Sequence, residues 1–245
     1  MQQSIHATIT RIIPLTNSVL QVFLQLSAPL KYEAGQYLEV ITQSGHRVPF
    51  SIANAPLGTD QLELHIRHTP ENKVNSEIIT EIQTRGALSI IGPFGQCTHL
   101  SLKPNCPIIF MARGSGFAPI KAIIEHFLTS GTATPMHLYW GARSIGDQYL
   151  DLPKSWAEHV EYFQYTPIFC PDTIGTPPPE KWTGRSGDLI DTIVQDHCPN
   201  LAKYQVLAAG PFDMIFKARH IFTQQGLKLE NMYSDAFAFE TGEEL

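Results

Sequence analysis

The stretch FMARGSGFAPIKAI, residues 110–123, joins an apolar run to a glycine turn and then to an amphipathic segment. Gly114 and Gly116 carry no side chains, so the backbone N–H groups and the positive end of a following helix can approach a phosphate. Pro119 suits the first turn of a helix, where its missing N–H is not needed. It also occupies the last glycine position of the pattern G-x-G-x-x-G, so the dinucleotide fingerprint is incomplete. The turn alone is equally compatible with a purely structural strand-to-helix connection.

The sequence around this turn has the pattern of apolar runs and helical segments that is typical of a parallel sheet. Continuous apolar or strand-like runs occur at residues 108–112 (IIFMA), 136–140 (MHLYW), 161–165 (EYFQY) and 206–209 (VLAA). Apolar stripes at helical spacing predict helices over residues 117–129 and 212–222. Such alternation predicts a parallel sheet covered by helices on both faces, forming an α/β domain over residues 105–245.

The first hundred residues have the two-residue period of antiparallel strands. In QLELHIRH, Leu62, Leu64 and Ile66 share one face, and SVLQVFLQL alternates in the same way. The period predicts half-buried strands at residues 5–13, 18–26, 37–42, 61–68 and 87–91. One helix is expected near residues 76–83, capped by Asn75 or Ser76. We therefore expect a small closed antiparallel barrel with one helix over residues 1–102, and a two-domain β plus α/β architecture.

Composition restricts the class of partner. The 245 residues are 43% hydrophobic and 16% charged, with a net charge of −6, which argues against nucleic acid as a ligand. No apolar run approaches the roughly 20 residues that cross a bilayer, so no membrane segment is expected. The start MQQSIHATIT lacks the pattern of a secretory signal, and we expect a cytoplasmic protein.

No metal centre is expected. The four cysteines, Cys97, Cys106, Cys170 and Cys198, form neither C-x-x-C nor an iron–sulfur spacing, and reduced core thiols are the simpler interpretation. In HIRH, His65 and His68 lie on opposite faces of a strand, which makes joint ligation unfavourable.

Six motifs in order resemble the ferredoxin-NADP reductase superfamily, and within it the branch of NAD(P)H-flavin reductases. They are RVPFSIANAP, GPFG, ARGSGFAPIKAI, YWGAR, AAGPFDM and SDAFAFE. The resemblance covers nearly the whole chain. It implies a flavin (FAD, FMN or riboflavin) held between the barrel and the sheet, and NADPH or NADH entering over the glycine turn to deliver hydride.

The resemblance also implies roles for individual residues. Pro49, Phe50 and Ser51 match the motif at the flavin edge, where the serine hydroxyl would steady the hydride acceptor and act as the catalytic group. The remaining expected cofactor-binding residues are Arg47, Asn75, Ser76, Arg113, Gly114, Ser115, Gly116, Arg143, Gly210, Pro211, Phe212, Asp213, Met214, Asp235 and Phe237, with Phe239 beside the flavin ring. Arg143, followed by Ser144, would lie at the adenosine and favours NADPH. Simpler interpretations are a strand hydroxyl for Ser51, core packing for the aromatic residues and a solvated surface pair for Arg143.

Three positions depart from the family pattern. The flavin-binding arginine position holds Val48, with Arg47 one residue earlier and therefore on the other strand face unless a bulge re-aims it. Val74 stands where a phosphate-binding glycine is expected. Arg113 stands where relatives of this branch carry glycine. The first two weaken the grip on a pyrophosphate and favour a loosely bound flavin. Arg113 either binds a flavin or nucleotide phosphate, or pairs with a nearby acid or fills the pocket.

Three functions follow from these residues. The first is an NAD(P)H:flavin oxidoreductase with a loosely bound flavin. The second is a reductase that keeps its flavin and passes electrons to a partner oxygenase, sugar-deoxygenation enzyme or ferredoxin. The third is a divergent nucleotide-binding module without catalysis.

Overall fold

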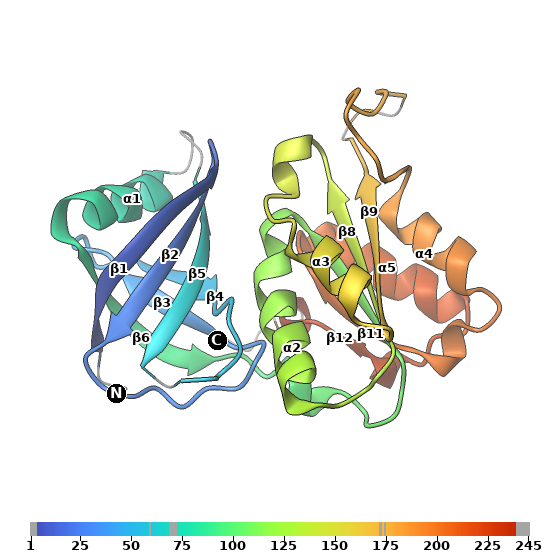
Figure 1. Cartoon of the computed structure of the whole chain (residues 1–245), viewed down its shortest axis with the longest axis horizontal. Coiled ribbons are helices and arrows are strands. Elements are labelled where there is room, and N and C mark those ends of the chain that lie inside the picture. The colour runs from blue at the N-terminus through green and yellow to red at the C-terminus, as the bar shows by residue number, and fades with distance from the viewer. Residues whose placement is uncertain (1–3, 59, 69–72, 172, 174, 239–245) are drawn as a thin grey trace.

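The computed structural model describes residues 4–58, 60–68, 73–171, 173 and 175–238, and it contains two six-stranded sheets that lie side by side (Figure 1). The strands of the first sheet are β1 (Ile5–Thr16), β2 (Val19–Leu26), β3 (Tyr37–Ile41), β4 (Arg47–Ser51), β5 (Gln61–Arg67) and β6 (Ala87–Phe94). Those of the second are β7 (Ile108–Arg113), β8 (Met136–Ala142), β9 (Phe163–Phe169), β10 (Arg185–Ser186), β11 (Gln205–Ala209) and β12 (Met232–Tyr233). The exact domain border, expected between residues 102 and 105, stays a prediction.

The first sheet is antiparallel, with the strand order β4-β3-β6-β1-β2-β5. Its two edges meet at an antiparallel bridge between Ile52, just after β4, and Leu64 of β5. Its inner face is an apolar core that includes Val22, Leu24 and Leu64, as the two-residue period predicts. The expected antiparallel domain is confirmed.

Helix α1 (Lys73–Arg85) adds Ile78 and Ile82 to this core. It begins earlier than predicted, so Asn75 lies inside the helix and is not its cap. The Asn75 side chain instead donates to the carbonyl oxygen of Arg67 at 2.8 Å. The predicted cap at Asn75 or Ser76 is therefore wrong, because the helix already begins at Lys73.

Strand β5 is also more buried than a half-exposed strand should be. Besides its apolar face, Glu63 and His65 are only 6% and 4% exposed. Their face of the strand points toward the second domain, which covers it. Polar residues are thus buried where the two domains meet.

The second sheet is parallel, with the order β10-β9-β8-β7-β11-β12. Helices α2 (Phe117–Ser130) and α3 (Leu152–His159) cover one face, and α4 (Leu189–His197) and α5 (Phe212–Gln224) cover the other (Figure 1). The predicted helices at 117–129 and 212–222 are confirmed. The strand order reverses between β7 and β11, and parallel sheets bind ligands at the carboxyl ends of strands at such a point.

No helix within the described residues has both the length and the apolar character needed to span a bilayer.

Candidate active site

The glycine turn, Gly114–Gly116, follows β7 directly at this reversal of strand order. Gly114 has a φ of +54°, a left-handed conformation that glycine adopts without strain. The buried indole of Trp140 donates to the Gly114 carbonyl oxygen at 3.1 Å and stacks on Phe117, with ring centroids 4.1 Å apart. A Cβ at Gly116 would lie 2.2 Å from the Ala209 carbonyl oxygen. Glycine at position 116 is thus what lets the turn pack against the end of β11.

The turn forms one wall of a first cavity of about 570 Å³ between the two sheets. Ser51 and Arg67 face this cavity from the antiparallel domain. The opposite wall comes from the carboxyl end of the parallel sheet, with Arg113, Gly114, Ser115, Gly116, Arg143, Gly210, Pro211, Phe212, Asp213 and Asp235 among its residues. Most predicted site residues therefore surround one space, although they come from five different segments of the chain.

A second cavity of about 450 Å³ adjoins the first. Ser51, Arg67 and Ser115 line both cavities. The second cavity is also lined by Pro49, Phe50, His65, Asn75 and Ala118. The two spaces thus meet at the serine that the sequence singles out, and together they offer room for two ring systems.

Arg67 supplies a cation beside both cavities. Its Nη2 atom donates to Oδ1 of Asp147 at 2.9 Å, and the backbone N–H of Arg143 donates to Oδ2 of Asp147 at the same distance. Burial acts to raise the pKa of Asp147, but these hydrogen bonds and the Arg67 charge outweigh it and hold the pKa below its usual value. Asp147 is therefore an anion that keeps the Arg67 guanidinium next to the glycine turn.

Asp235 faces the first cavity from the far side. Its carboxylate accepts a hydrogen bond from the backbone N–H of Cys97 at 3.2 Å. Burial raises the pKa of Asp235 to about 6, because the backbone hydrogen bonds only partly offset the loss of water. A carboxyl group with such a pKa changes its protonation state near neutral pH.

Arg113 lines the first cavity and also a third cavity of about 690 Å³ near the start of α4 and α5. Its backbone is extended, with φ −131° and ψ 125°. A Cβ at Gly210 would lie 3.2 Å from the Arg113 Cβ, so the absence of a side chain at Gly210 leaves room for the arginine. Burial raises the pKa of the Cys170 thiol, and the nearby Arg113 charge opposes that rise. The arginine thus stands where two cavities meet.

Four of the predicted residues that the structure describes lie elsewhere. Arg47 is exposed and its guanidinium is 3.4 Å from the Glu39 carboxylate. The register between β3 and β4 is regular, so no bulge re-aims Arg47, and Val48 packs against the barrel core. Met214 lines the third cavity. Phe237 packs on the core, and the Arg219 guanidinium lies 4.7 Å from the centre of its ring. Ser76 is described by the structure but lines none of these three cavities. Phe239 lies outside the described residues.

Sequence reasoning missed Arg67 and Asp147. A signal for Arg67 was present, because Glu63, His65 and Arg67 recur every second residue along a strand that ends before α1. Asp147 ends a short 3-10 helix (Ile145–Asp147) after β8 and carries no comparable pattern. No group of His, Cys, Asp or Glu able to hold a metal ion was found among the residues that the structure describes.

Comparison with known proteins agrees with this arrangement. Residues 6–99 match an oxidoreductase FAD-binding domain, and residues 110–220 match an oxidoreductase NAD-binding domain. The chain is 31% identical over 242 residues to an NAD(P)H-flavin reductase of Vibrio harveyi, covering 96% of this chain and 99% of that protein. It is 34% identical over 220 residues to the CDP-6-deoxy-L-threo-D-glycero-4-hexulose-3-dehydrase reductase of Yersinia pestis, covering 90% of this chain. A cytochrome P450 reductase of Amycolatopsis has a similar structure, with a TM-score of 0.83 and 25% identity, over 94% of this chain and 68% of that one.

A barrel beside a parallel sheet, with a glycine turn and a serine facing one cavity, defines a flavin- and nicotinamide-dependent oxidoreductase. The chain belongs to the ferredoxin-NADP reductase superfamily, and NAD(P)H-flavin reductases are among its relatives. It spans 64% of the length of the Yersinia reductase.

Proposed function

We propose that the chain is an NAD(P)H:flavin oxidoreductase that passes a hydride from a nicotinamide cofactor to a flavin. The observation that carries the proposal is the shared lining of the first two cavities. Ser51 of the FAD-binding half and Ser115 of the glycine turn both line both spaces. Hydride transfer needs two rings in contact and little acid–base chemistry, so orientation is the main task of the protein.

The residues around the cavities suit both ligands. Pro49 and Phe50 give the second cavity an apolar wall, and the Ser51 hydroxyl can hydrogen-bond a ring nitrogen. Gly114 and Gly116 line the first cavity directly before α2, whose N-terminus favours a phosphate. A bound flavin supplies the acceptor for the hydride. Ser51 would orient the flavin ring, and the glycine turn with Gly210 would hold the nicotinamide side.

A loosely bound flavin forms part of the proposal. Val48 packs against the barrel core, and Arg47 pairs with Glu39 away from the two cavities. Neither side chain offers a cation to a flavin phosphate there. The Vibrio harveyi relative is named a flavin reductase, which supports flavin as a substrate.

A second candidate function keeps the flavin and passes its electrons to a partner protein. Arg67 favours it, because this guanidinium offers a flavin phosphate the charge that Val48 lacks. The name of the Yersinia relative describes a reductase of a sugar dehydrase, and the Amycolatopsis relative is a cytochrome P450 reductase. These names support a sugar-deoxygenation enzyme or an oxygenase as the partner, with a ferredoxin as the further option.

We extend the proposal to the choice of nicotinamide cofactor and to the cellular location of the protein. The Arg143 side chain is half exposed at the rim of the first cavity, which favours the additional phosphate of NADPH. The four cysteines are free thiols, which supports the reducing cytoplasm.

One experiment separates the candidates: an absorbance spectrum of the dialysed protein, followed by titration with flavin and either NADH or NADPH. A colourless protein that oxidises the nicotinamide only when flavin is added supports the flavin reductase. A protein that stays yellow after dialysis supports the second candidate. Tight nucleotide binding without turnover would leave only the non-catalytic binding module.

A further inference from the structure

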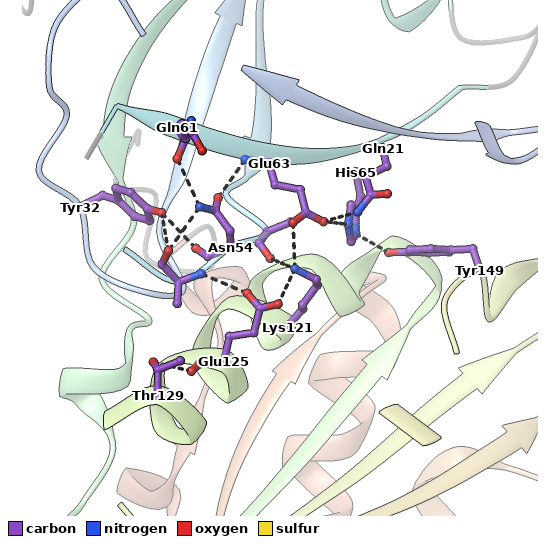
Figure 2. A network of polar contacts seen from close by, with 12 residues as sticks. Gln21, Tyr32, Asn54, Gln61, Glu63, His65, Lys121, Glu125, Thr129 and Tyr149 are labelled. Atoms are coloured by element: carbon purple, nitrogen blue, oxygen red, sulfur yellow. Dashed lines mark hydrogen bonds and ion pairs between the residues drawn. The ribbon is translucent and has the colours of Figure 1, made fainter. Parts of the chain in front are cut away.

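Lys121 is a buried lysine on α2, one turn beyond the residue that follows the glycine turn. It is 4% exposed, and its ammonium group contacts three oxygen atoms (Figure 2). The Nζ atom donates to the Ala53 carbonyl oxygen at 2.9 Å and lies 2.9 Å from Glu63 Oε2 and 2.7 Å from Glu125 Oε1. An ammonium group has three N–H bonds, so these contacts use all of them. Two of the three acceptors belong to the barrel.

Both carboxylates in this cluster have further barrel partners. Glu63 Oε1 accepts a hydrogen bond from Gln21 at 2.7 Å and is hydrogen-bonded to His65 Nε2 at 2.7 Å. Glu125 Oε2 accepts from the backbone N–H of Ala55 at 3.2 Å. Burial acts to raise the pKa of Glu63, but the His65 and Gln21 hydrogen bonds and the Lys121 charge prevail and lower it to about 2. The cluster is therefore a true ionic network across the domain boundary.

His65 makes a second bridge to the parallel domain. Its Nδ1 atom shares a hydrogen bond of 3.0 Å with the Tyr149 hydroxyl (Figure 2). The Tyr149 ring packs edge-on against Trp140, with centroids 5.1 Å apart, and Trp140 donates to Gly114. A continuous chain of contacts thus runs from β5 to the glycine turn.

Such a network is an unusual way to join two domains if stability alone matters. Burying charges costs solvation energy, and well-packed apolar residues often stabilise an interface equally well. Unlike apolar packing, ionic hydrogen bonds have a preferred direction and length. They therefore favour one placement of the two domains and disfavour sliding of one domain over the other. The placement matters here, since Ala53 lies two residues after Ser51 and Lys121 lies five residues after Gly116.

We propose that Lys121 is a positioning residue that fixes the Ser51 strand against the glycine turn and thereby sets the rate of hydride transfer. Through Ala53 and Glu63 it holds the flavin side of the cleft, and through α2 it holds the nicotinamide side. This role rests on the proposed function. The parallel domain supplies most of the lining of the first cavity and the barrel most of the second, so affinity depends on the network much less than the transfer step does.

The test compares Lys121→Met, Lys121→Arg and the triple variant K121M/E63Q/E125Q, which removes the charges together and leaves no carboxylate unpaired. Lys154→Met is the matched control, because Lys154 is exposed and pairs with Asp151 on the surface. Stopped-flow single turnover measures the hydride-transfer step, and titration measures the dissociation constants of flavin and nicotinamide. Hydrogen exchange measures the protection of the amides of residues 53–55, with β7 as the internal reference.

We expect the triple variant to lose about 10- to 100-fold in the transfer step, with small changes in both dissociation constants, since small misplacements slow such reactions strongly. Lys121→Arg should recover part of the rate, and the amides of residues 53–55 should exchange faster in the triple variant. A folded triple variant with native exchange and a native transfer rate overturns the positioning role. Weaker binding of both ligands with an unchanged transfer step overturns it as well. A wild-type protein that never oxidises nicotinamide with flavin present refutes the proposed function itself, which is a different result.

Discussion

The guanidinium of Arg67 and the carboxylate of Asp147 are 2.9 Å apart, although 80 positions separate the two residues in the chain. The first residue ends β5 of the barrel and the second follows β8 of the parallel sheet. Asp147 is only 6% exposed and also holds the Arg143 backbone. The contact therefore places a fixed positive charge next to the glycine turn, at the junction of the first two cavities.

Replacing Arg67 with glutamine should weaken the binding of phosphorylated flavins. A hydrogen bond to a charged group contributes about 1.5–3 kcal/mol, so the Michaelis constants of FMN and FAD should rise about 10-fold or more. Riboflavin, which has no phosphate, should bind almost as before. Steady-state kinetics with the three flavins checks this, with Arg11→Gln on the outer surface of β1 as the control. An equal loss for riboflavin and FMN would contradict a phosphate contact.

Ser51→Ala should slow the hydride step without weakening nicotinamide binding. The hydroxyl faces both cavities and would orient the ring that accepts the hydride. Loss of that orientation should lower the single-turnover rate by about 10-fold or more. Ser155→Ala on the surface of α3 provides the control. An unchanged rate in a folded Ser51→Ala variant would leave Ser51 as an ordinary strand hydroxyl.

Gly116→Ala should lower the thermal midpoint and the affinity for nicotinamide together. The new Cβ would lie 2.2 Å from a backbone oxygen of Ala209, which cannot rotate away. Overpacking of this kind costs about 1–3 kcal/mol. Calorimetry and kinetics measure the two effects. Gly58→Ala is the control, because the nearest atom to its Cβ is 3.6 Å away. Native stability of the Gly116→Ala variant would mean that the turn can move away from β11.

Asp235→Asn should stabilise the protein at pH 7. The pKa of Asp235 is about 6 in the folded chain and near 4 in an unfolded one, so the folded state binds the proton more tightly. Wild-type stability should therefore fall as the pH rises from about 4 to about 6 and stay lower above that range. A pKa difference of two units changes the free energy of unfolding by roughly 3 kcal/mol at most. Denaturant unfolding between pH 4 and 8 checks this, with the exposed Asp151→Asn as the control. Parallel pH curves for Asp235→Asn and the wild type would show that Asp235 does not titrate in this way.

Arg113→Gly separates the two interpretations of the arginine that precedes the glycine turn. If the guanidinium binds a phosphate, its removal should raise the Michaelis constant of the nicotinamide cofactor or of the phosphorylated flavin about 10-fold. If it fills the cleft, the rate should rise instead. Steady-state assays with NADPH, NADH, FMN and riboflavin distinguish these results. Unchanged Michaelis constants for both substrates refute the phosphate role.

The sequence predicted the elements whose signals are local. Alternation in QLELHIRH and the apolar run before Gly114 each reflect a single strand, and the helix after the turn shows its own stripe. The glycine turn and Ser51 were also recognisable, because their motifs are short and contiguous. These residues do surround one cleft.

Contacts between the two domains could not be predicted from local sequence patterns. The partners of Arg67 and Glu63 lie 80 and 58 positions away, and only the docking of the two sheets brings them together. The same docking buries the polar face of β5, which the two-residue period marks as exposed. The start of α1 was also misplaced, since Asn75, a good cap in isolation, lies inside the helix and donates to the Arg67 carbonyl oxygen.

The buried ionic cluster around Lys121 has a consequence for recombining relatives of this protein. A chimaera that takes its barrel from one reductase and its nucleotide-binding domain from another would combine buried charged residues that do not pair with one another. Swaps that carry positions 21, 53, 63, 65, 121, 125 and 149 as one block should give folded, working hybrids. A crossover at the predicted border near residues 102–105 alone should leave unpaired charges buried between the two domains.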